Sequence, residues 1–208
     1  FYQQHDIRFL LNRDTSSFAM EYARQHGPCI ASMGWRVENA EHAVAEALRR
    51  GARRYDGPTP FPGTPAIYGI GDSIIHLIEG DQYRGEFVVL PEPHIVPDKG
   101  FVAIDHLTNN VYKGTMQRWS DFYKTVFGFT EVRYFDIRGV KTGLRSYALR
   151  SPDGSFCIPI NEGNEDKSQI EEYLRKYNGP GIQHLAFLTN DLLDSLERIG
   201  KVRPKQIL

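Results

Sequence analysis

The chain has 208 residues, of which 40% are hydrophobic and 25% charged, a composition typical of a globular protein with one large core or two small ones. Its 25 Lys and Arg residues nearly balance its 26 Asp and Glu residues, for a net charge of -1. We therefore expect neither nucleic acid nor a membrane as a partner. The two cysteines, Cys29 and Cys157, lie far apart in apolar runs, which predicts buried, reduced thiols and a cytoplasmic protein.

Strand and helix signals alternate in the first half of the chain. A strand-like run at residues 6–11 begins so early that we expect the N-terminus to be incomplete. Residues 29–37 predict a strand, and residues 40–48 carry apolar side chains at helical spacing before a glycine. Residues 55–65 are rich in proline and glycine and predict a loop, whereas residues 66–78 predict a hairpin.

The clearest linker is residues 91–99, whose prolines exclude a central strand or helix. We therefore predict an N-terminal domain over residues 1–90 and a C-terminal domain over residues 100–208. Aromatic side chains at helical spacing after the linker predict a helix whose apolar stripe packs in the core: Trp119, Phe122, Tyr123, Phe127 and, beyond its end, Phe129. Further strands are predicted at residues 101–107, 131–137, 146–149, 156–160 and 182–188, and a further helix at residues 168–177.

An internal repeat links the two halves. Residues 27–35 match residues 179–187, and both copies continue into a helix that ends at a glycine. We interpret the match as a duplication of one supersecondary unit. His184 falls on Ser32 in this alignment, so one copy would carry a site and the other would be a scaffold.

Two histidines in strand-like runs, His106 and His184, suggest a metal site. Two imidazoles suit Fe(II), Zn or Cu, and a site with open positions is typical of the two-His, one-carboxylate centres of non-haem iron oxygenases. Carboxylates within the chain are poor candidates for the third ligand. Asp105 is expected on the opposite strand face, and Glu162 and Asp191 are expected at hydrated turns. A third ligand outside this chain is the simpler hypothesis.

Four polar residues, Ser146, Asn161, Gln169 and Gln183, lie at or beside predicted strand or helix starts around this site. Turn and cap chemistry is the simpler explanation for Asn161 and Gln169. The remaining histidines are interpreted as surface residues or as internally hydrogen-bonded ones. His76 is the one rival ligand, because it lies in an apolar hairpin.

Several stretches together resemble one family, the bacterial 4-hydroxyphenylpyruvate dioxygenases. They are residues 104–111, 133–137, 158–162 with 168–170, and 181–187, with weaker likeness at residues 6–12 and 26–28. The resemblance implies an α+β protein of the vicinal-oxygen-chelate fold, in which repeated βαβββ modules form two open-barrel domains, the second incomplete here. This agrees with the repeat. The likeness fails after Gly200, so residues 201–208 are expected to follow a break.

The resemblance also implies a site. The family's Fe(II) is held by two His and one Glu: His106 and His184 match the two His, and the Glu is expected outside this chain. Ser146, Asn161 and Gln183, with Gln169, match positions that the family uses around its substrate. The implied reaction converts 4-hydroxyphenylpyruvate and O2 to homogentisate and CO2 in tyrosine and phenylalanine catabolism, and the implied assembly is a homo-oligomer.

Three other hypotheses remain open from the sequence. A 4-hydroxymandelate synthase would look the same in this region and would use the same substrate and iron. A metal-free small-molecule-binding module of the same fold is the alternative outside enzymes. The third hypothesis is that the chain, with only two metal ligands, binds iron weakly and has no catalytic activity.

Overall fold

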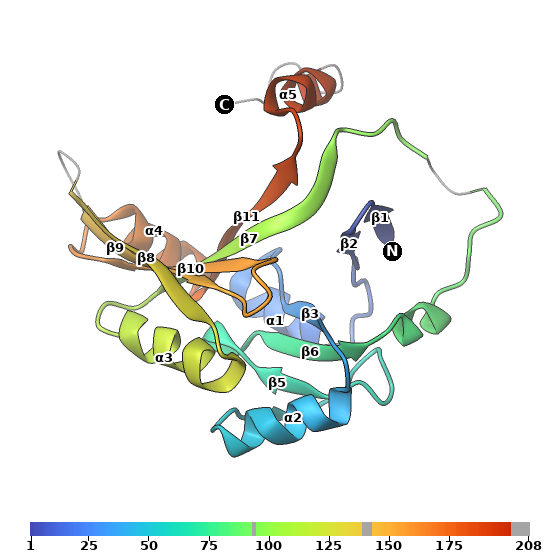
Figure 1. Cartoon of the computed structure of the whole chain (residues 1–208), viewed down its shortest axis with the longest axis horizontal. Helices are drawn as coiled ribbons and strands as arrows, with labels where there is room; N and C mark the ends of the chain where they lie inside the picture. Colours follow the sequence, from blue (N-terminus) through green and yellow to red (C-terminus); the bar gives the residue numbers. More distant parts are fainter. Residues whose placement is uncertain (93–94, 139–142, 201–208) are drawn as a thin grey trace.

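The computed structural model describes residues 1–92, 95–138 and 143–200 and shows an α+β protein (Figure 1). The described strands form sheets of two, four and five members, and helix α5 (Leu192–Gly200) lies at the far end of the long strands β7 (Phe101–Val111) and β11 (Gly181–Thr189). Within these ranges no helix has both the length and the apolar character that a membrane span requires. The break expected at residues 201–208 lies outside the described residues.

The first half contains one complete βαβββ module, β3–α2–β4–β5–β6. In its sheet β3 pairs in parallel with β6, and β5 lies antiparallel between β6 and β4, which confirms the predicted hairpin. The module is preceded by a β1–β2 hairpin and by helix α1, a helix that was not expected from the sequence. The elements are β1 (Tyr2–Gln4), β2 (Ile7–Phe9), α1 (Phe18–His26), β3 (Ser32–Val37), α2 (Ala40–Arg49), β4 (Arg54–Tyr55), β5 (Ala66–Tyr68), η1 (Ile70–Asp72), β6 (Ile74–Glu79) and η2 (Gln82–Glu86).

The second half repeats the same topology as β7–α3–β8–β9–β10. Here β7 pairs in parallel with β10, and β9 lies antiparallel between β10 and β8. A further strand, β11, pairs antiparallel with the outer edge of β7. The elements are β7 (Phe101–Val111), α3 (Met116–Phe127), β8 (Thr130–Arg138), β9 (Gly143–Arg150), β10 (Cys157–Gly163), α4 (Gln169–Tyr177), β11 (Gly181–Thr189) and α5 (Leu192–Gly200).

The predicted repeat is confirmed at the level of elements. Its two copies correspond to β3 followed by α2 and to β11 followed by α5, each a strand that leads into a helix. Because β3 and α2 are the first strand and helix of a complete module, β11 and α5 correspond to the first strand and helix of a further module. The sequence therefore repeats because the βαβββ unit repeats.

The predicted aromatic stripe on α3 lies in the core. Tyr123 is fully buried and Phe129 is 5% exposed, while Trp35 from β3 lies 4.6 Å from the Phe127 ring and 5.6 Å from the Phe129 ring, measured between centroids. Residues from both halves belong to this one hydrophobic cluster. The halves on either side of the predicted linker therefore pack against each other through a shared core.

Glu162 is not at a hydrated turn, and that expectation is wrong. The side chain lies on β10, is almost fully buried, and forms an ion pair with Arg145. Its Oε2 accepts hydrogen bonds from the backbone N–H groups of Gly114 (2.9 Å) and Met116 (3.2 Å). The N-cap residue Thr115 makes no side-chain cap bond, so Glu162 satisfies the free amides at the start of α3 instead.

Both cysteines are free thiols, but each is only partly buried. The expectation of full burial is therefore correct only in part. Burial raises the pKa of the Cys29 thiol, which keeps it protonated at neutral pH.

His76 on β6 is not a surface residue, and its Nδ1 atom is not internally hydrogen-bonded. It is 6% exposed, its Nδ1 has no hydrogen-bond partner, and the Phe61 ring packs edge-on with its centroid 5.6 Å away. Burial lowers the pKa of His76 to about 4, so the ring is neutral in the folded protein.

Because the folded pKa of His76 lies below the unfolded value, folding stability should fall as the pH falls. The contribution is complete above pH 6.5 and is lost progressively toward pH 4, by up to about 3 kcal/mol. Denaturant unfolding at several pH values measures it. In His76→Leu the difference in unfolding free energy between pH 7 and pH 4 should be smaller by about 3 kcal/mol than in wild type. An unchanged difference would contradict the lowered pKa of His76.

Candidate metal centre

His106 and His184 lie on neighbouring antiparallel strands, β7 and β11. Ala186 pairs with His106 and His184 pairs with Thr108, so the two histidines are offset by two residues along the strands. Their ring centroids are 5.6 Å apart and their planes are inclined at 79°. With metal–nitrogen bonds of about 2.1 Å, two rings at this separation can bind one ion. The donor chemistry therefore fits a divalent transition metal.

Asp105 contacts the His106 ring, so the expectation that it points to the opposite face is wrong. Its Oδ2 lies 2.6 Å from His106 Nδ1. Since the carboxylate is the acceptor, Nδ1 carries a proton, and in the neutral imidazole the lone pair is then on Nε2. A carboxylate in this position fixes the tautomer and raises the basicity of a metal-binding imidazole.

A β-bulge brings Gln183 and His184 together. The register of β11 on β7 shifts between Ile182 and His184, so Gln183 is an extra residue and the strict alternation of faces is broken. Both side chains are exposed, and Gln183 Oε1 accepts a hydrogen bond from His184 Nδ1 at 2.6 Å. Neighbouring residues can therefore serve the same site.

The second nitrogen of His184 accepts a hydrogen bond from a hydroxyl. Thr108 Oγ1 lies 3.0 Å from Nε2, and a metal at Nε2 would replace this bond. Burial, together with the charge of His106, lowers the pKa of His184. The imidazole is therefore neutral at neutral pH, which is the form that binds metals.

Ser146 and Asn161 lie on the same sheet face as His106. Residues 106, 108 and 110 alternate onto one face of β7, and Asn161 pairs with Asn110 on one side and with Ser146 on the other. Asn161 Nδ2 donates to Asn110 Oδ1 at 3.3 Å. Their hydroxyl and amide groups therefore form a polar row across three strands beside the histidines.

Gln169 is the first residue of α4 and is exposed. Among the described residues it forms no hydrogen bond to the other predicted site residues. The part of the chain that the structure describes also contains no cluster of three His, Cys, Asp or Glu residues that could hold a metal ion. A third metal ligand thus stays a prediction.

A hollow of about 1950 Å³ does not coincide with the histidines. Its lining includes Ile104, Leu107 and Leu185 together with much of the N-terminal half, but none of the six predicted site residues, all of which are described. Leu107 and Leu185 are the immediate neighbours of His106 and His184. The hollow thus lies on the other face of the β7–β11 pair.

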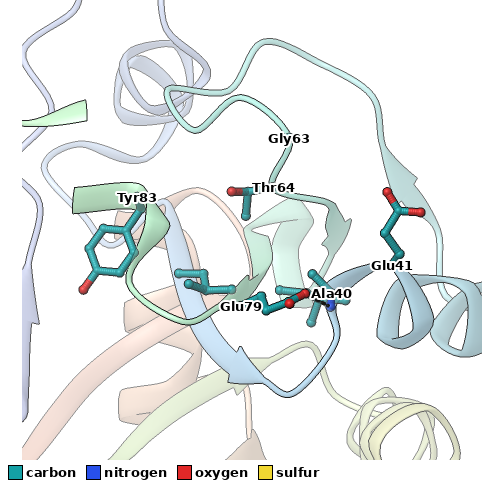
Figure 2. Close-up of a pocket in the computed structure, with 8 residues that line it drawn as sticks. Ala40, Glu41, Gly63, Thr64, Glu79 and Tyr83 are labelled. Atoms are coloured by element: carbon teal, nitrogen blue, oxygen red, sulfur yellow. Dashed lines mark hydrogen bonds between the residues drawn. The ribbon is translucent and has the colours of Figure 1, made fainter. Parts of the chain in front are cut away.

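A smaller hollow, of about 190 Å³, lies at the start of α2. Figure 2 shows Glu79 beside Ala40, with Glu41 and Tyr83 on either side. Glu79 Oε2 accepts a hydrogen bond from the Ala40 backbone N–H at 3.0 Å. This carboxylate has a structural explanation, because it satisfies a free amide at a helix N-terminus.

Two family models match the chain. Residues 1–90 match the model described as "Hydroxyphenylpyruvate dioxygenase, HPPD, N-terminal", and residues 103–201 match the "Glyoxalase/Bleomycin resistance protein/Dioxygenase superfamily". The two matches follow the two modules described above and leave residues 91–102 between them.

Curated relatives match over almost the whole chain. The protein named MelA from Shewanella colwelliana is 57% identical over 95% of this chain and 59% of its own length. A 4-hydroxyphenylpyruvate dioxygenase from Pseudomonas sp. is 43% identical over 96% of this chain and 59% of its own length. A second, from Pseudomonas aeruginosa, is 41% identical over 95% and 57%. The chain thus spans less than two thirds of the length of these relatives.

Solved structures share the fold. A xylose isomerase-like TIM barrel/4-hydroxyphenylpyruvate dioxygenase fusion protein superposes with a TM-score of 0.78 at 26% identity, over 97% of this chain and 32% of that one. A mutant of 4-hydroxymandelate synthase from Streptomyces coelicolor superposes with a TM-score of 0.73 at 22% identity, over 91% and 57%. The predicted fold class, repeated vicinal-oxygen-chelate modules, is confirmed.

Proposed function

The chain belongs to the 4-hydroxyphenylpyruvate dioxygenase family, and from this premise we propose that the protein converts 4-hydroxyphenylpyruvate and O2 to homogentisate and CO2 with Fe(II). The observation that carries the proposal is the pair of imidazoles on β7 and β11, whose centroids are 5.6 Å apart. His106 and His184 would hold the iron, and a Glu outside this chain would complete the ligand set.

Bound Fe(II) would supply the chelation of the 2-oxo acid and the activation of O2. The chain's own residues would orient the substrate. Ser146, Asn161 and Gln183 present neutral hydroxyl and amide groups, which can both donate hydrogen bonds to the phenol and carboxylate of the substrate and accept them from the phenol. Gln169 at the start of α4 is proposed to join them. Because these four side chains are uncharged, the iron would be the main positive charge that attracts the anionic substrate.

Asp105 is proposed to set the tautomer of His106. In the full-length protein Asp105→Asn should weaken metal binding by about 10–100-fold, because a neutral amide can either accept from Nδ1 or donate to it, and it raises the basicity of the imidazole less than a carboxylate does. Isothermal titration with Fe(II) under anaerobic conditions measures the affinity. Unchanged affinity would mean that the 2.6 Å contact has no part in metal binding.

Product identification tests the proposed reaction. The full-length protein is incubated with Fe(II), ascorbate, O2 and 4-hydroxyphenylpyruvate, and the product is identified by mass spectrometry. Homogentisate is expected. Hydroxymandelate would replace the proposal by a 4-hydroxymandelate synthase, and no turnover in protein that contains no iron would replace it by a metal-free binding module.

Three further features belong to the proposal. The division into an N-terminal domain (residues 1–90), a linker (91–99) and a C-terminal catalytic domain (100–208) is supported by the prolines of the linker. A cytoplasmic location in tyrosine and phenylalanine catabolism is supported by the free thiols and by the family. A homo-oligomer is proposed by family likeness alone.

A further inference from the structure

A short connection leads from α4 to the strand that carries His184. Helix α4 ends at Tyr177, Asn178 adopts the left-handed conformation (φ 62°), Gly179 has a φ of 141°, and β11 begins at Gly181. The bulge at Gln183 follows two residues later. Since so few residues intervene, a displacement of the connection would move the bulge and the His184 ring with it.

His26, the last residue of α1, binds this connection from the N-terminal half. Its Nδ1 lies 2.8 Å from the Tyr177 carbonyl oxygen, and a carbonyl can only accept, so Nδ1 donates. Its ring also stacks on the Tyr177 ring, with centroids 4.6 Å apart and planes inclined at 22°. The hydrogen bond satisfies one of the carbonyls that every helix C-terminus leaves free.

A second contact lies next to the first. Tyr22 of α1 donates a hydrogen bond from its hydroxyl to the Gly71 carbonyl (3.0 Å). Gly71, with a φ of 63°, lies so close to Pro180 that a Cβ at this position would collide with the Pro180 carbonyl oxygen. The η1 turn of the N-terminal module therefore packs directly on the backbone that enters β11.

Tyr173 of α4 extends the contact toward the bulge. Its hydroxyl donates to the Ile182 carbonyl at 3.0 Å, and its ring stacks on Tyr177 with centroids 4.9 Å apart. Burial raises the pKa of Tyr173, Tyr177 and Tyr22, so these hydroxyls are neutral donors at physiological pH. The chain of contacts from α1 thus reaches the residue that precedes Gln183.

We propose that His26 is a positioning residue for the metal centre. By holding the Tyr177 carbonyl, it fixes the connection between α4 and β11 and thereby the bulge that presents Gln183 and His184. The N-terminal module, which supplies none of the proposed metal ligands, would act on the site through this contact. The inference rests on the proposed function, because it assumes that His184 binds a metal.

Matched variants of the full-length protein separate the hydrogen bond from general stability. His26→Ala removes both donor and ring, whereas His26→Asn keeps an N–H donor near the position of Nδ1. Gly71→Ala adds a methyl group that collides with the Pro180 carbonyl oxygen and so displaces the same connection through the η1 turn. His42→Asn is the control, because His42 is exposed on α2 and makes none of these contacts. The readouts are the dissociation constant of Co(II) and its visible absorption spectrum, measured well below the Tm of each variant.

We expect His26→Ala and Gly71→Ala to weaken Co(II) binding about tenfold, the lower end of outer-shell effects, and to change the spectrum. His26→Asn should recover most of the affinity for Co(II), and His42→Asn should have the affinity and spectrum of wild type. Wild-type affinity and spectrum in His26→Ala would overturn the inference, even if its Tm falls. A His26→Asn variant that binds Co(II) no more tightly than His26→Ala would overturn it too. A wild-type protein that binds no Co(II) would instead overturn the proposed function, and the inference with it.

Discussion

Replacing either His106 or His184 by alanine is expected to abolish iron binding and turnover in the full-length protein. Each substitution removes one of the two imidazoles whose rings lie 5.6 Å apart. Removing a metal ligand should cost more than the roughly 10–100-fold in affinity that is lost with an outer-shell partner. Iron content after anaerobic reconstitution and gel filtration measures binding, and the rate of homogentisate formation measures turnover.

The matched control is His42→Ala, in which an exposed histidine outside the sheet is removed. It should retain the iron content and turnover of wild type. Full activity in His106→Ala or His184→Ala would refute the site. Loss of turnover with retained iron would assign that histidine to the reaction, but not to metal binding.

Replacing Glu162 is expected to have a large effect on stability. Its buried carboxylate pairs with Arg145 and accepts hydrogen bonds from two amides at the start of α3. Glu162→Gln keeps the size and an acceptor but leaves the Arg145 charge without its partner. Breaking a buried ion pair in this way costs about 3–5 kcal/mol, and we expect about 2–3 kcal/mol because the Arg145 side chain is 40% exposed. Urea unfolding measures the difference.

Glu162→Ala should be more destabilising than Glu162→Gln, because it also leaves the amides of Gly114 and Met116 without an acceptor. The control is Glu172→Gln on α4, which removes an exposed ion pair with Lys176 and should leave the urea midpoint unchanged. Equal midpoints for Glu162→Gln and wild type would show that the buried ion pair contributes nothing to stability.

The modular fold could be predicted from the sequence because its signals are local. The aromatic spacing on α3 predicted both the helix and its buried face, and the helix ends at Gly128, which has a φ of 71°. The repeat of residues 27–35 at 179–187 predicted the recurrence of one unit. The two histidines could be predicted as a pair because each lies in a matching strand of such units.

Other features of the structure could not be predicted in this way, and most of them depend on tertiary contacts that the hydrophobic periodicity of the sequence does not reveal. Helix α1 was missed although Ser17 caps it by accepting a hydrogen bond from Met20 N (3.2 Å), a signal that was present in the sequence. Asp105 was misplaced because the pairing of β7 with β11 skips this residue, and such a bulge breaks the strict alternation of strand faces. Glu162 was misplaced because its partners, Gly114 and Met116, are distant in sequence.

The bulge at Gln183 is the clearest case of this kind. Strict alternation would place Gln183 and His184 on opposite faces, yet the shifted register of β11 lets the two side chains meet at 2.6 Å. A bulge is set by the pairing of β11 with β7, so a single strand's sequence does not specify it. Family resemblance assigned both residues to one site before any geometry explained how they could share it.

The most direct test of the site is a crystal structure of the full-length protein loaded with iron, located by anomalous scattering at the iron edge. We expect one iron with a ring nitrogen of His106 and a ring nitrogen of His184 each at about 2.1 Å, and a third, carboxylate ligand that is not among the residues of this sequence. Iron bound elsewhere, or bound without these two histidines, would contradict the proposed site.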